Sequence, residues 1–88
     1  MKKITTLQAR DRKFYIVKND QGYYLAIENK YIDENGKLNT NLNGLQMNAS
    51  KDLNECLKRT KDQIEVDFLV SNGMDALKAI QLVVLGIA

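Results

Sequence analysis

The strongest nucleophile in this 88-residue sequence is its single cysteine, Cys56. A catalytic thiol normally has a base beside it, usually a histidine, that raises its thiolate fraction. The sequence contains no histidine, and Cys56 lies next to Leu57 in a run of apolar residues at helical spacing. We therefore expect Cys56 to be a small buried hydrophobic residue and not a catalytic one.

Carboxylates are the other side chains that could do chemistry. The Asp-Glu-Asn-Gly-Lys segment at 33–37 has its glycine at the fourth position and a lysine at a donor position, so it predicts a hairpin turn and not a calcium loop. Glu65 and Asp67 would point about 200° apart on a helix, which prevents them from acting as a hydrolytic pair. On a strand they would share one face. The sequence predicts no enzyme, no metal site and no cofactor.

Basic residues are concentrated at the N-terminus. Residues 1–18 contain six lysines and arginines and one acidic residue, whereas the other seventy contain seven basic and ten acidic residues. A basic strand that also carries Phe14 and Tyr15 could bind a phosphate backbone and stack bases. The residues that would make this contact are Lys3, Arg10, Arg12, Lys13 and Lys18. The alternative is that they form the solvated side of an edge strand, and the net charge of only +2 favours this alternative.

The first half of the chain has the pattern of antiparallel strands. Lys13–Lys18 and Tyr23–Ile32 are rich in aromatic and β-branched residues, and a polar Asn-Asp-Gln-Gly segment separates them, which predicts a hairpin. Residues 4–9 could form a further strand. An Asn-Gly turn at 35–36, a return strand from Leu38, a loop at 39–44 and an edge strand at 45–48 complete the expected sheet of three to five strands.

The second half has helical periodicity. Ser50 is a good N-cap, and apolar residues then recur at gaps of three and four as far as Phe68. Residues 63–70 also alternate as a strand would, but the absence of Gly or Pro favours one helix over about 51–71. Gly73 can end this helix, and Asp75 can cap a second one over about 74–86. The expected fold is therefore a single α+β domain over residues 1–88, with two helices packed on one face of the sheet.

The second helix is apolar on nearly all sides: Met74, Leu77, Ile80 and Val84, with the neighbouring Ala76 and Ala79, form one apolar side, and Lys78 and Gln81 are expected to face outward. A helix of this kind must be covered on more than one side, which is difficult in so short a chain. One cysteine and no histidine also leave no internal disulfide or zinc site to stabilise the domain, so self-association is the remaining common device. We expect an interface that involves Tyr24 as an outward-facing strand residue and, at the second helix, Leu82, Val83, Leu85 and Ile87.

These observations predict a small non-catalytic protein-interaction module that forms a homodimer or binds another protein. Nucleic-acid binding through the N-terminal strand is the alternative. The unpaired cysteine is typical of a cytoplasmic protein, and no segment is long enough to span a membrane. The Asn-Gly turns and the helix-Gly-helix pair give the chain the general look of short accessory or inhibitor proteins from bacterial mobile elements. This is a likeness of style that implies no role for any single residue.

Overall fold

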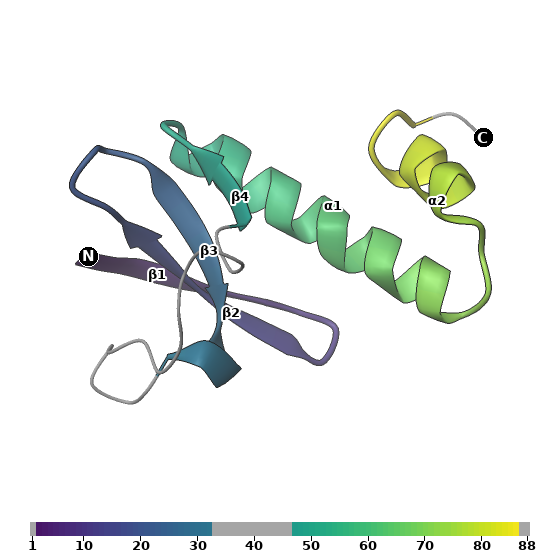
Figure 1. Cartoon of the computed structure of the whole chain (residues 1–88), viewed down its shortest axis with the longest axis horizontal. Helices are drawn as coiled ribbons and strands as arrows, with labels where there is room; N and C mark the ends of the chain where they lie inside the picture. The colour runs from purple at the N-terminus through teal and green to yellow at the C-terminus, as the bar shows by residue number, and fades with distance from the viewer. Residues whose placement is uncertain (1, 33–46, 87–88) are drawn as a thin grey trace.

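The computed structural model describes residues 2–32 and 47–86 (Figure 1). The elements, in chain order, are β1 (Lys2–Ala9), β2 (Arg12–Lys18), β3 (Tyr24–Glu28), the short 3-10 helix η1 (Asn29–Tyr31), β4 (Met47–Ser50), α1 (Leu53–Ser71) and α2 (Ala76–Val83). The four strands form an antiparallel sheet in the order β1-β2-β3-β4. The predicted α+β fold, with strands first and two helices last, is confirmed.

The hairpin between β2 and β3 is confirmed as well, and its turn has a clear physical basis. The Asn19 side-chain oxygen accepts hydrogen bonds from the backbone N–H groups of Gln21 at 3.0 Å and Tyr23 at 2.9 Å. Gly22 has a φ of +87°, a conformation that side chains disfavour. The predicted edge strand at 45–48 is found at Met47–Ser50. The predicted Asn-Gly turn at 35–36, the return strand from Leu38 and the loop at 39–44 lie outside the described residues.

Helix α1 begins two residues later than expected. Asp52, and not Ser50, is the N-cap: its carboxylate accepts from the N–H groups of Asn54 at 2.9 Å and Glu55 at 3.4 Å. The Ser50 prediction is wrong because Ser50 pairs with Tyr24 as the last residue of β4. The helix then continues without a break through residues 63–70, so the helical prediction for this segment is confirmed and the strand alternative is wrong.

Buried apolar residues line both faces of the sheet. The larger core lies between the sheet and α1, and it consists of Leu7, Phe14, Ile16, Ala26, Cys56 and Ile64. A second cluster, Val17, Leu25 and Ile27, lies on the opposite face, because successive residues of a strand point to opposite sides. The first cluster fixes the N-terminal half of α1 on the sheet.

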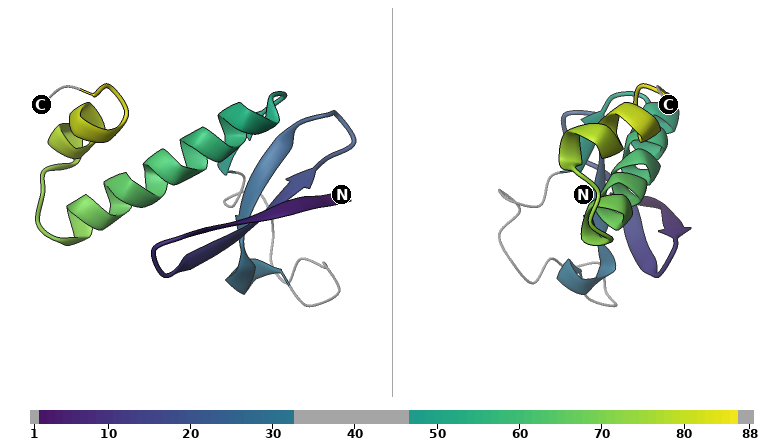
Figure 2. Two further views of the ribbon diagram at one scale, coloured as in Figure 1. Left: turned by 180° about the vertical axis from the view of Figure 1, so that it is seen from behind. Right: turned by 90° about the vertical axis from the view of Figure 1, so that its right-hand side faces the viewer.

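The C-terminal half of α1 extends beyond the sheet, and α2 packs against it (Figures 1 and 2). The chain reverses between the helices at Gly73, whose φ is +100°. The N–H of Gly73 donates to the carbonyl of Val70, and that of Met74 donates to the carbonyl of Leu69, both at 3.0 Å. This is the Schellman arrangement, and it confirms the predicted end of the first helix. Asp75 caps α2 as expected, through the N–H of Lys78.

Candidate protein-interaction site on the second helix

The thiol of Cys56, the strongest nucleophile in the sequence, is not exposed to solvent. The Cys56 side chain is completely buried in the larger core. Burial raises the pKa of its thiol, which disfavours the reactive thiolate. Over residues 2–32 and 47–86, no three histidine, cysteine or carboxylate side chains come close enough together to hold a metal ion. Neither helix in this part of the chain is long and apolar enough to cross a membrane.

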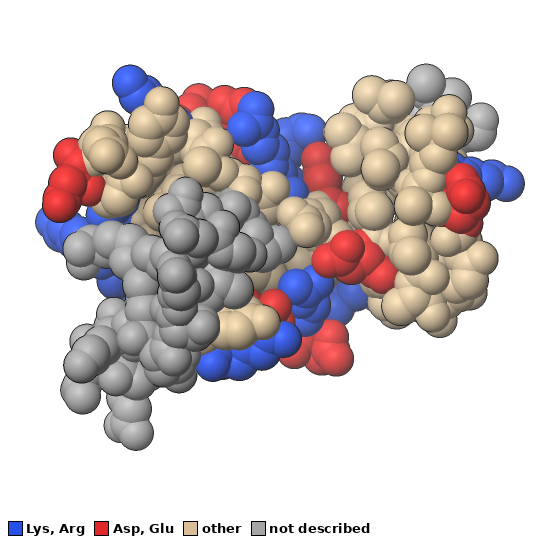
Figure 3. Space-filling model, viewed as in Figure 1, with Lys and Arg blue, Asp and Glu red and all other residues tan. Residues whose placement is uncertain are grey.

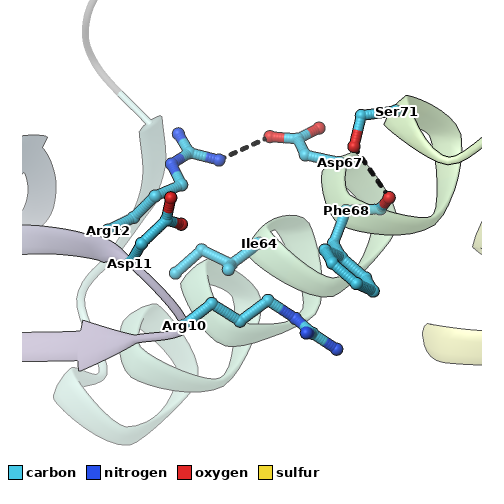
Figure 4. A pocket seen from close by; sticks show the side chains of 7 residues that line it. All are labelled: Arg10, Asp11, Arg12, Ile64, Asp67, Phe68 and Ser71. Atoms are coloured by element: carbon cyan, nitrogen blue, oxygen red, sulfur yellow. Dashed lines mark hydrogen bonds and ion pairs between the residues drawn. The ribbon is translucent and has the colours of Figure 1, made fainter.

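Glu65 and Asp67 bind the two arginines of the β1–β2 hairpin. Arg10 forms a bidentate pair with Glu65, with both N–O distances at 2.9 Å. Arg12 donates to Asp67 at 2.9 Å (Figure 4) and to both carboxylate oxygens of Glu28 on β3, at 2.9 and 3.3 Å. We call these five residues the arginine clasp. The clasp ties the end of the hairpin to the half of α1 that extends beyond the sheet, and so it positions α2.

Arg10 contributes to the clasp from an unusual backbone conformation. Its φ is 55°, in the left-handed region that non-glycine residues rarely adopt. The guanidinium carbon of Arg10 lies 3.4 Å from the centre of the Phe68 ring, over the helix surface (Figure 4). The bidentate ion pair and this cation–π contact both act on the same side chain, so together they can offset the local backbone cost.

The pKa shifts in the clasp favour the charged forms of its side chains, as expected for ion pairs. The hydrogen bonds and charge of Glu65 raise the pKa of Arg10, and the hydrogen bond from Arg10 lowers the pKa of Glu65. Glu28 and Asp67 likewise raise the pKa of Arg12. The clasp borders an open hollow of about 540 Å³, lined also by Asp11, Ile64, Phe68 and Ser71. Since the arginines and carboxylates of the clasp already pair with one another, we interpret this hollow as a part of the contact between the hairpin and α1 and not as a ligand site.

The five candidates for nucleic-acid contact do not form one surface. Arg10 and Arg12 are neutralised in the clasp. Lys3 lies over the Tyr15 ring, 4.4 Å from its centre, on the sheet face opposite α1, and the alternation along β2 places Lys13 on that face too. Lys18 lies over Tyr24 on the α1 side, at 5.3 Å. Two of the five candidates are therefore paired with carboxylates of the protein itself, and the other three lie on both faces of the sheet.

Tyr24 does not have the outward position that we predicted for it. Its ring packs against the larger core, because Tyr24 shares a sheet face with Ala26 and that face is covered by α1. Tyr23 is the tyrosine that is exposed, at 39%. The expectation of an interface residue at Tyr24 therefore rested on the wrong assignment of sheet faces.

Helix α2 exposes a different set of apolar residues from the one expected. Ala79 is fully buried, and Leu82 and Val83, two predicted interface residues, are half-buried on the same side of the helix. The opposite side carries Leu77 at 65% exposure and Val84 at 47%. Ile80 at 40% and Leu85 at 61% are exposed as well. We call the four residues Leu77, Ile80, Val84 and Leu85 the α2 patch. Ile87 lies outside the described residues.

Helix α2 and the residues that flank it carry little charge. Asp75 and Lys78 are the only charged residues between positions 72 and 86, and Figure 3 shows that most of the surface over α2 is neither acidic nor basic. A groove of about 380 Å³ between the helices adjoins the patch. Its apolar lining is Val66, Ile80 and Val84, and its polar lining is Asn48, Arg59, Asp62, Gln63 and Asp67. Ile80 and Val84 belong to both the patch and the groove, so the apolar surface continues into the groove as far as Val66, and polar and charged residues border it there.

Sequence periodicity alone could not identify this patch, because a helix with apolar residues on all sides has no distinguishable packing face. The clasp was also missed, although one signal was present: two arginines flanking a tight turn and two carboxylates on one helix. No protein-family model, no curated protein and no solved structure matches the chain.

Proposed function

We propose that this protein is a non-catalytic interaction module that pairs with a second copy of itself through the α2 patch. The observation that supports this is the exposure of Leu77, Ile80, Val84 and Leu85 on a helix whose other side is already packed on α1. Exposed apolar patches of this kind on small proteins commonly mark interaction surfaces. Burial in a dimer would remove these side chains from water.

A second copy is the partner that the charges favour. In a twofold pair the same surface meets itself, so any net charge on it would repel its copy. The α2 patch avoids this cost because Asp75 and Lys78 have opposite signs and the remaining residues of α2 are neutral. The groove beside the patch, with Val66, Ile80 and Val84 in its lining, also offers a place for a leucine side chain of the other copy.

Sedimentation velocity of the wild type and two patch variants tests the proposal. We expect a dimer at high micromolar concentration, and monomers for Leu77→Lys and Val84→Lys, because a buried lysine without a partner opposes association. Gln21→Lys adds the same charge in the exposed β2–β3 turn and should remain dimeric. A wild-type protein that stays monomeric at high micromolar concentration would contradict the proposal.

We further propose that the protein is an accessory or inhibitor protein of a bacterial mobile element that acts in the cytoplasm on a host protein, which the single cysteine and the composition support. For the nucleic-acid alternative, the lysines Lys3, Lys13 and Lys18 remain available. Salt-sensitive binding to DNA or RNA that disappears when these three lysines are changed to glutamate would favour the alternative.

A further inference from the structure

Strand β1 forms one edge of the sheet. It pairs with β2 along its whole length, and no strand in the described part of the chain pairs with its other side. An edge strand presents N–H and C=O groups that another extended chain can bind. With eight residues, β1 is twice as long as β4 at the other edge, which has four.

The strand register shows which main-chain groups of β1 point outward. In the β2–β3 hairpin, the N–H of Asn19 donates to the carbonyl of Tyr23. Main-chain groups alternate in direction along a strand, so the N–H and C=O groups of residues 17 and 15 also point toward β3. The residues that alternate with them, including Phe14, therefore bond toward β1. Their partners on β1 are residues 5, 7 and 9. The main chain of Thr6 and Gln8 must then face outward, away from β2.

The side chains of β1 leave this outward edge accessible. Thr5, Thr6 and Gln8 are exposed, and residues 4–9 carry no charge. An irregularity in the pairing falls between Lys3 and Thr5, so the regular part of the edge is the uncharged one. The length and regularity of this segment are suitable for pairing with an added strand.

Four lysines without a carboxylate partner in the described part of the chain lie near the edge, on both faces of the sheet. Lys2 and Lys3 lie at the N-terminal end of β1, and Lys13 and Lys18 lie on β2. Among the described residues, no carboxylate is within ion-pair distance of these four lysines. Arg10 and Arg12, by contrast, are fully engaged in the clasp. A second β1 strand would bring its own lysines to this surface, whereas an acidic strand would compensate them.

We propose that the outer edge of β1 binds an extended acidic segment of another protein as an added strand. The main chain of Thr6 and Gln8 would bond with the backbone of the segment, and Lys3 would face its acidic side chains. A nucleic acid could use the lysines, but it has no backbone amides to pair with this edge. This surface is distinct from the α2 patch, and the proposal does not depend on self-association.

Binding of a fluorescent peptide in which glutamate alternates with valine tests the proposal by anisotropy. Proline at position 6 removes an outward N–H and leaves the β1–β2 pairing intact, since proline is tolerated where a strand N–H faces solvent. We expect Thr6→Pro to weaken binding about tenfold or more, because a main-chain hydrogen bond is lost and the ring obstructs the edge. Thr6→Val retains the N–H and should bind as the wild type does.

Three further comparisons test the roles of the peptide backbone, of its charge and of the α2 patch, and the first of them separates strand addition from simple charge attraction. A peptide of the same sequence with alternate backbone nitrogens methylated should lose binding, and so should a peptide with lysine in place of glutamate. Val84→Lys should bind the acidic peptide normally. Equal binding of the methylated peptide, equal affinity of Thr6→Pro and Thr6→Val, or binding of oligothymidylate in preference to the acidic peptide would overturn the proposal.

Discussion

Arg12 connects three elements of the fold through one side chain. Its guanidinium group contacts Glu28 on β3 and Asp67 on α1, and its own backbone belongs to β2. The Arg12 side chain is 26% exposed and that of Glu28 is 16% exposed, so this pair is shielded more than an ordinary surface ion pair. Partly shielded, bidentate pairs of this kind contribute more than exposed ones.

Replacing Arg12 with alanine should therefore destabilise the protein by about 1–3 kcal/mol, because Glu28 loses charged hydrogen bonds in a half-buried position. The free energy of unfolding in urea measures this. Lys58→Ala is the matched control: it breaks an exposed pair with Asp62 on the surface of α1 and should cost only about 0.3–0.5 kcal/mol. Equal losses for the two variants would show that the clasp does not hold the elements together.

The Arg10–Glu65 pair predicts a pH dependence with a definite sign. Arg10 lowers the pKa of Glu65 below its ordinary value of 4.5. The pair therefore contributes its full stability above that value and loses it as the pH falls through the lower pKa of the folded state. Thermal melting over this acidic range should show a smaller fall in Tm for Glu65→Gln than for the wild type. Parallel curves for the two proteins would contradict this assignment.

At the residue scale the sequence correctly predicted that Cys56 is buried among apolar residues. It did not predict the clasp, whose partners on the hairpin and on α1 are 55 residues apart. In the sequence, charged residues that are so far apart cannot be distinguished from charged residues that are simply exposed to solvent. Only the approach of the β1–β2 turn to α1 makes them partners.

At the scale of elements, α1 shows how strand pairing overrides local preference. Both Ser50 and Asp52 belong to residue types that favour the N-cap. The pairing of Ser50 with Tyr24 retains the serine in β4, where its hydroxyl accepts from the N–H of Asp52 and donates to Glu55. Asp52 is then the first residue free to cap the helix.

Asp52→Ala should cost about 1 kcal/mol of stability, because two N–H groups in the first turn of α1 lose their acceptor. Asp52→Asn should lose much less, since asparagine is an equally good N-cap. Urea denaturation of the two variants gives the comparison. A similar loss for both would indicate that the negative charge, and not the capping hydrogen bond, is responsible.

Periodicity correctly predicted the elements that have one apolar face, such as the β2–β3 hairpin and the N-terminal half of α1. It was insufficient for α2, where apolar residues occur on every side and the packing of Ala79 on α1 determines which of them are exposed. The small alanine side chain allows close approach of the two helices. The larger Leu77 and Val84 then remain on the outside.

At the scale of the whole molecule, the protein is elongated, with extents of 40 × 24 × 21 Å. The length arises because α1 continues beyond the sheet and carries α2 at its far end (Figure 2). The larger core fixes one half of α1, and the clasp and α2 support the other. This arrangement places the α2 patch at the opposite end of the molecule from the β2–β3 turn, where a second copy can approach it.

The most direct test of a role for this patch is a dilution series of the isotopically labelled protein followed by ¹H–¹⁵N NMR. We expect concentration-dependent shifts in the amides of residues 76–85 and of the neighbouring groove residues on α1, with the amides of β1 and the β2–β3 turn unchanged. Spectra that do not change between low and high micromolar concentration, or changes confined to the sheet, would contradict it.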